Sequence, residues 1–191
     1  MRLLFIGLLV GGSIACSRVP SAGMWWAEGA LSLPAHDANR IGGLLTPAEA
    51  QTIREVSRAE LERAFAGLRI SFTDHEDTFW RVEVVHQLPG SGEAYAWGLR
   101  GWARVGFVHL ASNAIHHAPP GAQRSTIVRG IGAGIGRAAA HELAHLVGAV
   151  AHNATDEDSY EYIHADRPSQ YYGELHWTVA EPLLRRRLRA R

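Results

Sequence analysis

The sequence contains little cysteine, little methionine and no excess of charge of either sign. Its single cysteine, Cys16, excludes any disulfide within the chain. The 19 basic and 19 acidic side chains give a formal net charge of zero, so nothing global favours nucleic acid or an anionic surface as a partner. The two methionines, Met1 and Met24, both lie near the N-terminus. The sequence also contains no internal repeat, and nothing in it indicates an oligomeric state.

The one long apolar run is at the N-terminus, where Arg2 is followed by an apolar stretch over residues 3–12. A basic residue, a short apolar segment and then small residues are typical of a secretory signal peptide rather than a membrane span. The segment Ser13-Ile14-Ala15-Cys16 resembles a bacterial lipobox, with Ser13 where leucine is usual, and this resemblance implies that Cys16 is lipidated. We therefore expect the protein to be exported across the inner membrane and anchored by a lipid in the bacterial cell envelope, at the outer membrane or in the periplasm. This lipid anchor would be its only contact with a membrane. The alternative is an ordinary signal peptide and an extracellular protein.

The rest of the chain is long enough for one domain with its own core. We divide the sequence into a signal peptide over residues 1–16, a tether and irregular N-terminal segment over 17–43, and one folded domain over 44–191. Trp25 and Trp26 are interpreted as packing anchors rather than as a platform for a ligand.

Periodicity and capping signals predict helices on both sides of a set of strands. Thr46-Pro47-Ala48-Glu49 is a capping box with proline at the first helical position, and it opens a helix that ends near Gly67. Apolar residues at helical spacing predict a largely buried helix from about Thr126 to Ala151 and a C-terminal helix from about Thr178. Strand-forming residues predict three strands, at 68–73, 80–87 and 104–111, with a hairpin or loop over 93–102.

The most informative segment is His141-Glu142-Leu143-Ala144-His145, which has the pattern H-E-x-x-H. Residues i and i+4 of a helix project from the same face, so both imidazoles can bind one zinc ion. Glu142 then lies beside the metal, where it can take a proton from a water molecule whose pKa zinc has lowered. The alternative is a non-enzymatic envelope-binding protein in which both histidines are core residues. A pair at i and i+4 with a glutamate between them favours zinc-dependent hydrolysis.

A catalytic zinc site has three protein ligands, so a third is expected nearby. Gly148 can end the helix in the left-handed conformation and turn the chain back, which would bring His152 to the metal. Other side chains downstream are alternative candidates for the third ligand, or for a hydrogen-bond partner of a ligand histidine. The acidic run Asp156-Glu157-Asp158 is also typical of a solvated loop. The alternative candidates are Asp156, Glu157, Asp158, Glu161, His164, Glu174 and His176.

Here the chain resembles the metzincin branch of the zincin metallopeptidases, whose longer pattern is H-E-x-x-H-x-x-G-x-x-H. Gly148 matches the glycine, whereas His152 comes one residue late, with Ala151 at the usual position, and no methionine follows for a Met-turn. The resemblance covers about residues 44–152. It implies an α+β fold in which a twisted mixed sheet packs on a backing helix and an HExxH active-site helix, followed by a small, mainly helical C-terminal part. It also implies Zn²⁺ as the cofactor and a peptide or protein as the substrate. A different zincin branch takes a glutamate from a later helix as its third ligand.

In zincins an extended peptide pairs with the strand at the lower rim of the sheet. Residues 106–112 are the candidate for this strand, with an interior strand as the alternative. Aromatic segments after the motif match the lower wall of the zincin cleft, where a tyrosine or histidine can donate a hydrogen bond to the developing oxyanion; packing is the alternative role. The candidate oxyanion donors are Tyr160, Tyr171, Tyr172 and His176.

Glycine occupies every second position from Gly130 to Gly136. No strand leads into this run and it continues into the motif helix, so a nucleotide-binding loop is disfavoured. The glycines either allow the helix to pack closely under the sheet or form an access loop, with the helix beginning only near Arg137.

Together these features predict a small, exported zinc metallopeptidase. The alternatives that keep the metal are another zinc amidohydrolase and a zinc-binding envelope lipoprotein without turnover.

Overall fold

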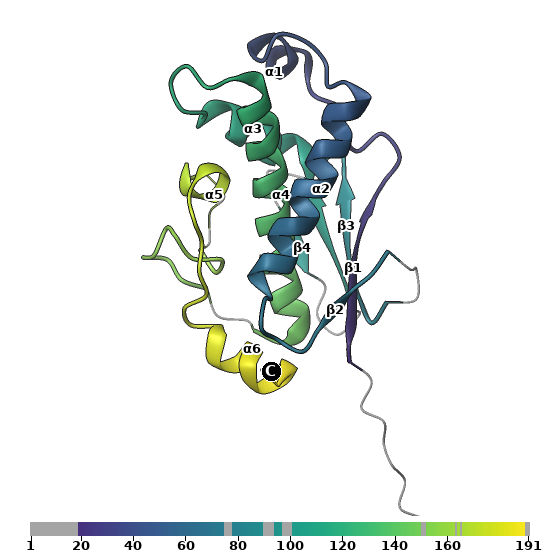
Figure 1. Ribbon diagram of the computed structural model, residues 1–191, viewed down its shortest axis with the longest axis vertical. Coiled ribbons are helices and arrows are strands. Elements are labelled where there is room, and N and C mark those ends of the chain that lie inside the picture. Colours follow the sequence, from purple (N-terminus) through teal and green to yellow (C-terminus); the bar gives the residue numbers. More distant parts are fainter. Residues whose placement is uncertain are drawn as a thin grey trace, which may run out of the picture.

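The computed structural model describes residues 19–74, 78–89, 94–96, 101–149, 152–162, 164 and 166–189. A five-stranded sheet lies against two long helices, and a loop-rich C-terminal part follows them (Figure 1). The predicted signal peptide and Cys16 lie outside the described residues. Within the described part, no helix combines the length and apolarity that crossing a membrane would require.

The sheet has the strand order β2-β1-β3-β5-β4. Its first four members run parallel, whereas the edge strand β4 is antiparallel to β5. The strands are β1 (Ser21–Trp26), β2 (Ser71–Phe72), β3 (Trp80–Val85), β4 (Ala94–Ala96) and β5 (Trp102–Gly106). The mixed sheet and the general α+β class predicted from the sequence are confirmed.

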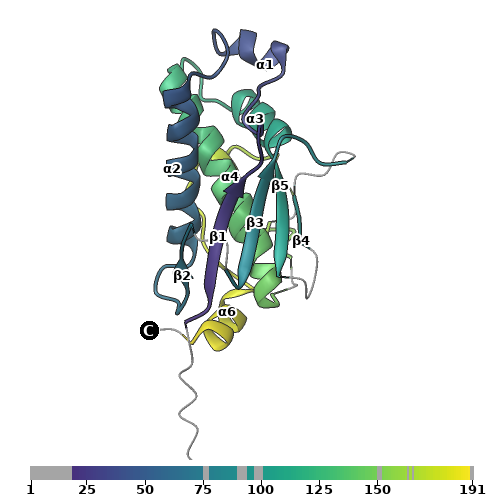
Figure 2. The same cartoon turned by 90° about the vertical axis from the view of Figure 1, so that its right-hand side faces the viewer.

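One face of the sheet forms the core. Side chains alternate along a strand, and Met24, Val82 and Ala103, which are neighbours in register, are all buried. Both long helices lie on the same side of the sheet (Figure 2). The opposite face carries cation–π pairs instead, with the Arg104 guanidinium 5.1 Å from the centre of the Trp102 ring.

The prediction of an irregular N-terminal segment over residues 17–43 was wrong. Ser21–Trp26 is the inner strand β1, between β2 and β3, and Ala35–Arg40 forms the short helix α1. Pro20 precedes the strand and Gly23 lies within it, which obscured its alternation. Trp25 and Trp26 pack against arginines, with guanidinium-to-ring distances of 4.7 Å to Arg81 and 5.8 Å to Arg54.

The backing helix α2 (Pro47–Ala64) begins with the capping box predicted from the sequence. The Thr46 N–H donates to the Glu49 carboxylate at 2.8 Å, and the Glu49 N–H donates to the Thr46 hydroxyl at 3.2 Å. The Glu49 carboxylate also accepts two hydrogen bonds from Arg124, at 2.6 and 2.9 Å. Because Arg124 is the first residue of the motif helix α4 (Arg124–Val147), this ion pair joins the beginnings of the two long helices.

The glycine run lies inside α4, so it is not an access loop. A Cβ atom at Gly132 would lie 2.9 Å from the Ile53 carbonyl oxygen of α2, and one at Gly136 only 2.4 Å from the Ser57 carbonyl oxygen. The other two glycines accommodate aromatic rings, Gly130 that of Tyr172 and Gly134 that of Tyr171. The alternating glycines therefore allow close approach on two sides of one helix.

The strand predicted over residues 104–111 ends at Gly106, and Phe107–His116 is the helix α3. Phe107, Leu110 and Ala114 are fully buried at the i, i+3, i+7 spacing of a helix, which outweighs their strand propensity. Residues 106–112 are therefore not the substrate-pairing strand, and the prediction was wrong. The strands predicted at 68–73 and 80–87 are shorter than expected.

The C-terminal part is not mainly helical, contrary to prediction. It contains two short helices, α5 (Ser169–Tyr172) and α6 (Glu181–Leu188), of which α6 begins three residues after the predicted start. Turns and two isolated bridges, Asn153 to Tyr162 and Ser159 to His176, make up much of the rest. Polar side chains bonded to the backbone hold these turns, so they leave no helical periodicity in the sequence.

Close packing of α2 and α4 predicts that Gly136→Ala destabilises the protein, although alanine is the better helix former by about 1 kcal/mol. The new Cβ would meet the Ser57 carbonyl oxygen at 2.4 Å and the Glu60 Cβ at 2.6 Å, and the backbone carbonyl cannot move aside cheaply. Overpacking of this kind costs about 1–3 kcal/mol, which urea unfolding would measure. Comparison of Arg129→Ala with Arg129→Gly, at an exposed position of the same helix, is the control for propensity alone. A Gly136→Ala protein at least as stable as the natural one would contradict the packing.

Candidate metal site

The site lies where the last turn of α4 meets the C-terminal loops. His141 and His145 are one helical turn apart, and Gly148 ends the helix with a left-handed φ of 102°, as predicted. The Gly148 N–H donates to the His145 carbonyl at 2.9 Å. The chain then turns back, and the ring of His152 stacks on that of His141 with centroids 5.1 Å apart.

Two backbone carbonyls determine how the helical histidines are oriented. Nδ1 of His141 lies 2.7 Å from the Tyr160 oxygen, and Nδ1 of His145 lies 2.7 Å from the Ala149 oxygen. A carbonyl oxygen can only accept, so each Nδ1 must carry the proton. In the neutral imidazoles the lone pair is then on Nε2, which is the tautomer that a metal ligand needs.

The three Nε2 atoms converge on one point. The distance is 3.0 Å from His145 Nε2 to His141 Nε2 and 3.0 Å to His152 Nε2. Burial lowers the pKa of His145, an effect that the Ala149 carbonyl opposes and the neighbouring His152 reinforces. Two neutral Nε2 lone pairs facing each other repel unless a cation lies between them. Nitrogens bound tetrahedrally at about 2.05 Å are about 3.3 Å apart, close to the spacing found here.

These three histidines are the one group of three or more potential ligand side chains found among the described residues. The downstream carboxylates left open as third ligands are not part of it. Glu161 instead accepts hydrogen bonds from the backbone N–H groups of Thr178 and Ala180, at 2.9 and 2.6 Å. Asp156 pairs with His176, whose Nε2 lies 3.0 Å from the Asp156 carboxylate. The geometry therefore favours His152 as the third ligand.

Glu142 is buried beside the histidines, with only 5% of its surface exposed. It precedes His145 by three residues, so these two side chains are neighbours on the helix surface. Burial raises the pKa of this carboxyl from 4.5 to about 8. In the protein without metal, Glu142 is thus mostly protonated at neutral pH, and a cation nearby would favour its ionised form.

The candidate oxyanion donors take other positions. The Tyr160 side chain is buried, and its ring lies 4.8 Å from that of Trp177, so this residue meets the site through its carbonyl. Tyr171 packs on Gly134, and Tyr172 packs on Gly130 and donates to the Ala114 oxygen at 2.6 Å. These glycines precede His141 by seven and eleven residues, about 10 and 16 Å along the helix. The structure therefore does not bring the Tyr171 and Tyr172 rings to the three histidines.

Sequence reasoning missed the groups that orient the ligands, namely the carbonyls of Tyr160 and Ala149 and the loops behind them. Backbone carbonyls belong to every residue, so no residue type marks them. The one available signal is the polar density of the segment after His152, where Asn153, Thr155 and Asp156 form a turn around the Asn153 side-chain oxygen.

No protein-family model, no curated protein and no solved structure matches this chain. The functional interpretation therefore depends on the residues and their geometry.

The convergence of three imidazoles predicts that His152→Ala weakens binding of a divalent metal ion, with Zn²⁺ as the probe. Loss of a direct ligand should exceed the roughly 10- to 100-fold effect of losing an outer hydrogen-bond partner. Competition with a chromophoric chelator would measure the dissociation constant. His164→Ala is the matched control, because His164 is exposed and lies outside the cluster. Equal zinc affinity in the two variants would contradict His152 as a ligand.

The raised pKa of Glu142 predicts how the stability of the metal-free protein depends on pH. Between pH 4.5 and about 8 the unfolded chain ionises this carboxyl, whereas the folded protein keeps it protonated. The stability contributed by Glu142 is thus present below pH 4.5 and is lost as the pH rises to about 8, by up to about 1.4 kcal/mol per pH unit.

Glu142→Gln removes this titration. Relative to the natural protein, the metal-free variant should become more stable as the pH rises from 5 to 8, as measured by urea unfolding in the presence of a chelator. A stability difference independent of pH would show that Glu142 is ionised in the folded state.

Proposed function

We propose that this protein is a zinc metallopeptidase with a zincin-like fold. The observation that carries the proposal is the convergence of three Nε2 atoms, two of them held in the metal-binding tautomer by backbone carbonyls, next to a buried glutamate. Imidazole also suits copper, iron and nickel, so the choice of zinc rests on the H-E-x-x-H pattern. Three histidines leave a fourth position for water or substrate, which is the arrangement of a catalytic rather than a structural zinc site.

The catalytic roles follow from which groups can move protons. When bound, zinc acidifies a water molecule and polarises a carbonyl group. Glu142 takes a proton from the attacking water and later delivers it to the leaving amine, so that the amide bond breaks to a carboxylate and an amine. Burial raises the pKa of Glu142 to about 8 in the metal-free protein, and a bound cation would favour the ionised form that takes the proton. His141, His145 and His152 hold the metal and exchange no protons.

The sheet suggests where a peptide substrate would bind. β4 is one of the two edge strands of the sheet, and unlike β2 it packs near α4, the helix that carries the metal ligands. An extended peptide can add to an exposed edge through backbone hydrogen bonds. We therefore assign to Ala94–Ala96 the substrate-pairing role that the sequence had suggested for residues 106–112.

The alternatives differ in what they predict for purified protein. A zinc amidohydrolase that does not cleave peptides, or a zinc lipoprotein without turnover, binds stoichiometric zinc but leaves a peptide library intact. An envelope-binding protein whose histidines are core residues binds no zinc. Export and lipidation at Cys16 remain part of the proposal, and radiolabelled palmitate incorporation that is lost in Cys16→Ser would test them.

Under the proposed mechanism, Glu142→Ala keeps zinc bound and abolishes peptide hydrolysis. Losing a general base costs about 10²–10⁴-fold in rate, and digestion of a peptide library followed by mass spectrometry would measure it. Glu157→Ala is the matched control, since Glu157 is an exposed carboxylate in the C-terminal loops. Substantial turnover by pure Glu142→Ala protein would reject the role of Glu142, and a natural protein that binds zinc but cleaves nothing would reject the peptidase.

A further inference from the structure

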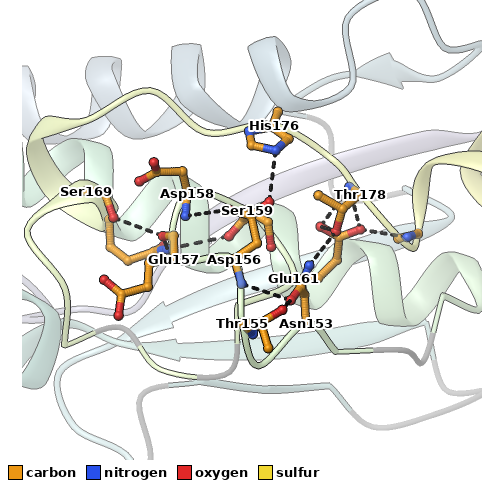
Figure 3. A network of polar contacts seen from close by, with 12 residues as sticks. Asn153, Thr155, Asp156, Glu157, Asp158, Ser159, Glu161, Ser169, His176 and Thr178 are labelled. Atoms are coloured by element: carbon orange, nitrogen blue, oxygen red, sulfur yellow. Dashed lines mark hydrogen bonds and ion pairs between the residues drawn. The ribbon is translucent and has the colours of Figure 1, made fainter.

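A directed chain of side-chain hydrogen bonds joins the two loops that approach the metal site (Figure 3). Asn153 Nδ2 donates to the Thr178 hydroxyl at 3.0 Å, and the Thr178 hydroxyl donates to Glu161 Oε2 at 3.2 Å. An amide nitrogen can only donate and a carboxylate can only accept, so the hydroxyl must accept from one and donate to the other. The direction of the chain is therefore fixed.

Each end of this chain is adjacent to a metal-binding group. Asn153 follows His152, and Glu161 follows Tyr160, whose carbonyl orients His141. The Asn153 N–H also donates to the Glu161 carbonyl at 2.9 Å, so backbone and side chains connect the same two loops. A change in the distance between these loops would move His152 relative to His141.

Glu161 is a rigid anchor for the chain. Only 2% of its surface is exposed, and both carboxylate oxygens are used. Oε1 accepts from the N–H groups of Thr178 and Ala180, at 2.9 and 2.6 Å, and Oε2 lies 3.1 Å from the Thr178 N–H. A buried carboxylate is costly unless such donors surround it, so any displacement of the 178–180 loop would leave a buried charge poorly bonded.

The Asn153 side-chain nitrogen is available to bond Thr178, because the turn after Asn153 uses only the side-chain oxygen. The oxygen is occupied by the turn that follows, because it accepts from the N–H groups of Thr155 and Asp156, at 2.9 and 3.0 Å. The nitrogen is thereby directed to Thr178. The turn fixes the chain just after His152, and the nitrogen attaches that turn to the Glu161 anchor.

We propose that Thr178 and Glu161 are positioning residues for the third metal ligand, acting on His152 through Asn153. The inference rests on the metal site of the proposed function but not on peptide cleavage. The buried Glu161 carboxylate of the C-terminal loops would thus hold the third metal ligand, His152, in position.

Thr178→Val tests the link with little change in shape, because valine replaces the hydroxyl by a methyl group and keeps the backbone N–H that bonds Glu161. We expect a roughly tenfold rise in the zinc dissociation constant, at the lower end of what outer-partner substitutions cost. Thr178→Ser, which keeps the hydroxyl, should bind zinc as the natural protein does. Unchanged affinity in Thr178→Val would overturn the proposal.

A double-mutant cycle separates positioning from general stability. If Thr178 acts through His152, T178V weakens zinc binding in the natural protein but adds little in the H152A background. An equal loss in both backgrounds would mean that Thr178 merely stabilises the fold, and would overturn the proposal. Circular dichroism would verify folding, and Thr178→Ala removes the same hydroxyl if the valine variant does not fold.

Failure of this inference can be told apart from failure of the proposed function. Intact coupling between Thr178 and His152 in a protein that digests no peptide would reject the peptidase and keep the positioning role. Peptide cleavage that depends on Glu142, together with zinc affinity insensitive to Thr178, would do the reverse.

Discussion

The hydrogen bonds from the two helical histidines to backbone carbonyls are the interactions on which the site depends. Each carbonyl compels its imidazole to carry the proton on Nδ1, so both bare Nε2 atoms face the same point. The Ala149 carbonyl is in place because Gly148 turns the chain at the end of α4, whereas the Tyr160 carbonyl comes from a loop after His152. The helix thus supplies the ligands, and the segments after it determine their chemical state.

The helix in turn depends on close packing. Ser57 donates to the Gly132 carbonyl at 2.9 Å, which is possible because the glycines let α2 approach α4 almost backbone to backbone. The Arg124–Glu49 ion pair joins the first turns of the same two helices. Arg137, buried one turn before His141, donates to the carbonyls of Ser169 and Gly173 at 2.8 and 2.7 Å. The segment from Ser169 to Gly173 is therefore attached to the helix that carries the ligands, one turn before His141.

The features that could be predicted from the sequence are those that depend on short-range interactions along the chain. The capping box at Thr46, the left-handed turn at Gly148 and the common face of His141 and His145 each depend on a few neighbouring residues, and all could be read from the sequence. The failures involve tertiary context. Strand-forming residues after Gly106 became a helix because their buried positions recur at helical spacing, and β1 is defined by its two neighbours in the sheet rather than by its own composition. The partners of the ligand histidines are backbone atoms from distant loops, for which the sequence carries no residue-specific mark.

Two buried glutamates near the site differ in what surrounds them, and this difference separates their roles. Glu161 is bonded through both oxygens to fixed donors, so displacing its carboxylate would break several hydrogen bonds at once. Burial raises the pKa of Glu142 to about 8 in the metal-free protein, whereas a bound cation would favour the ionised form of this carboxyl. A group that must accept and return a proton in each turnover needs an environment like that of Glu142. A group that must keep a loop in place needs fixed hydrogen-bond donors like those around Glu161. In the proposed mechanism Glu142 is therefore suited to proton transfer and Glu161 to support, although both are glutamates within twenty residues of each other.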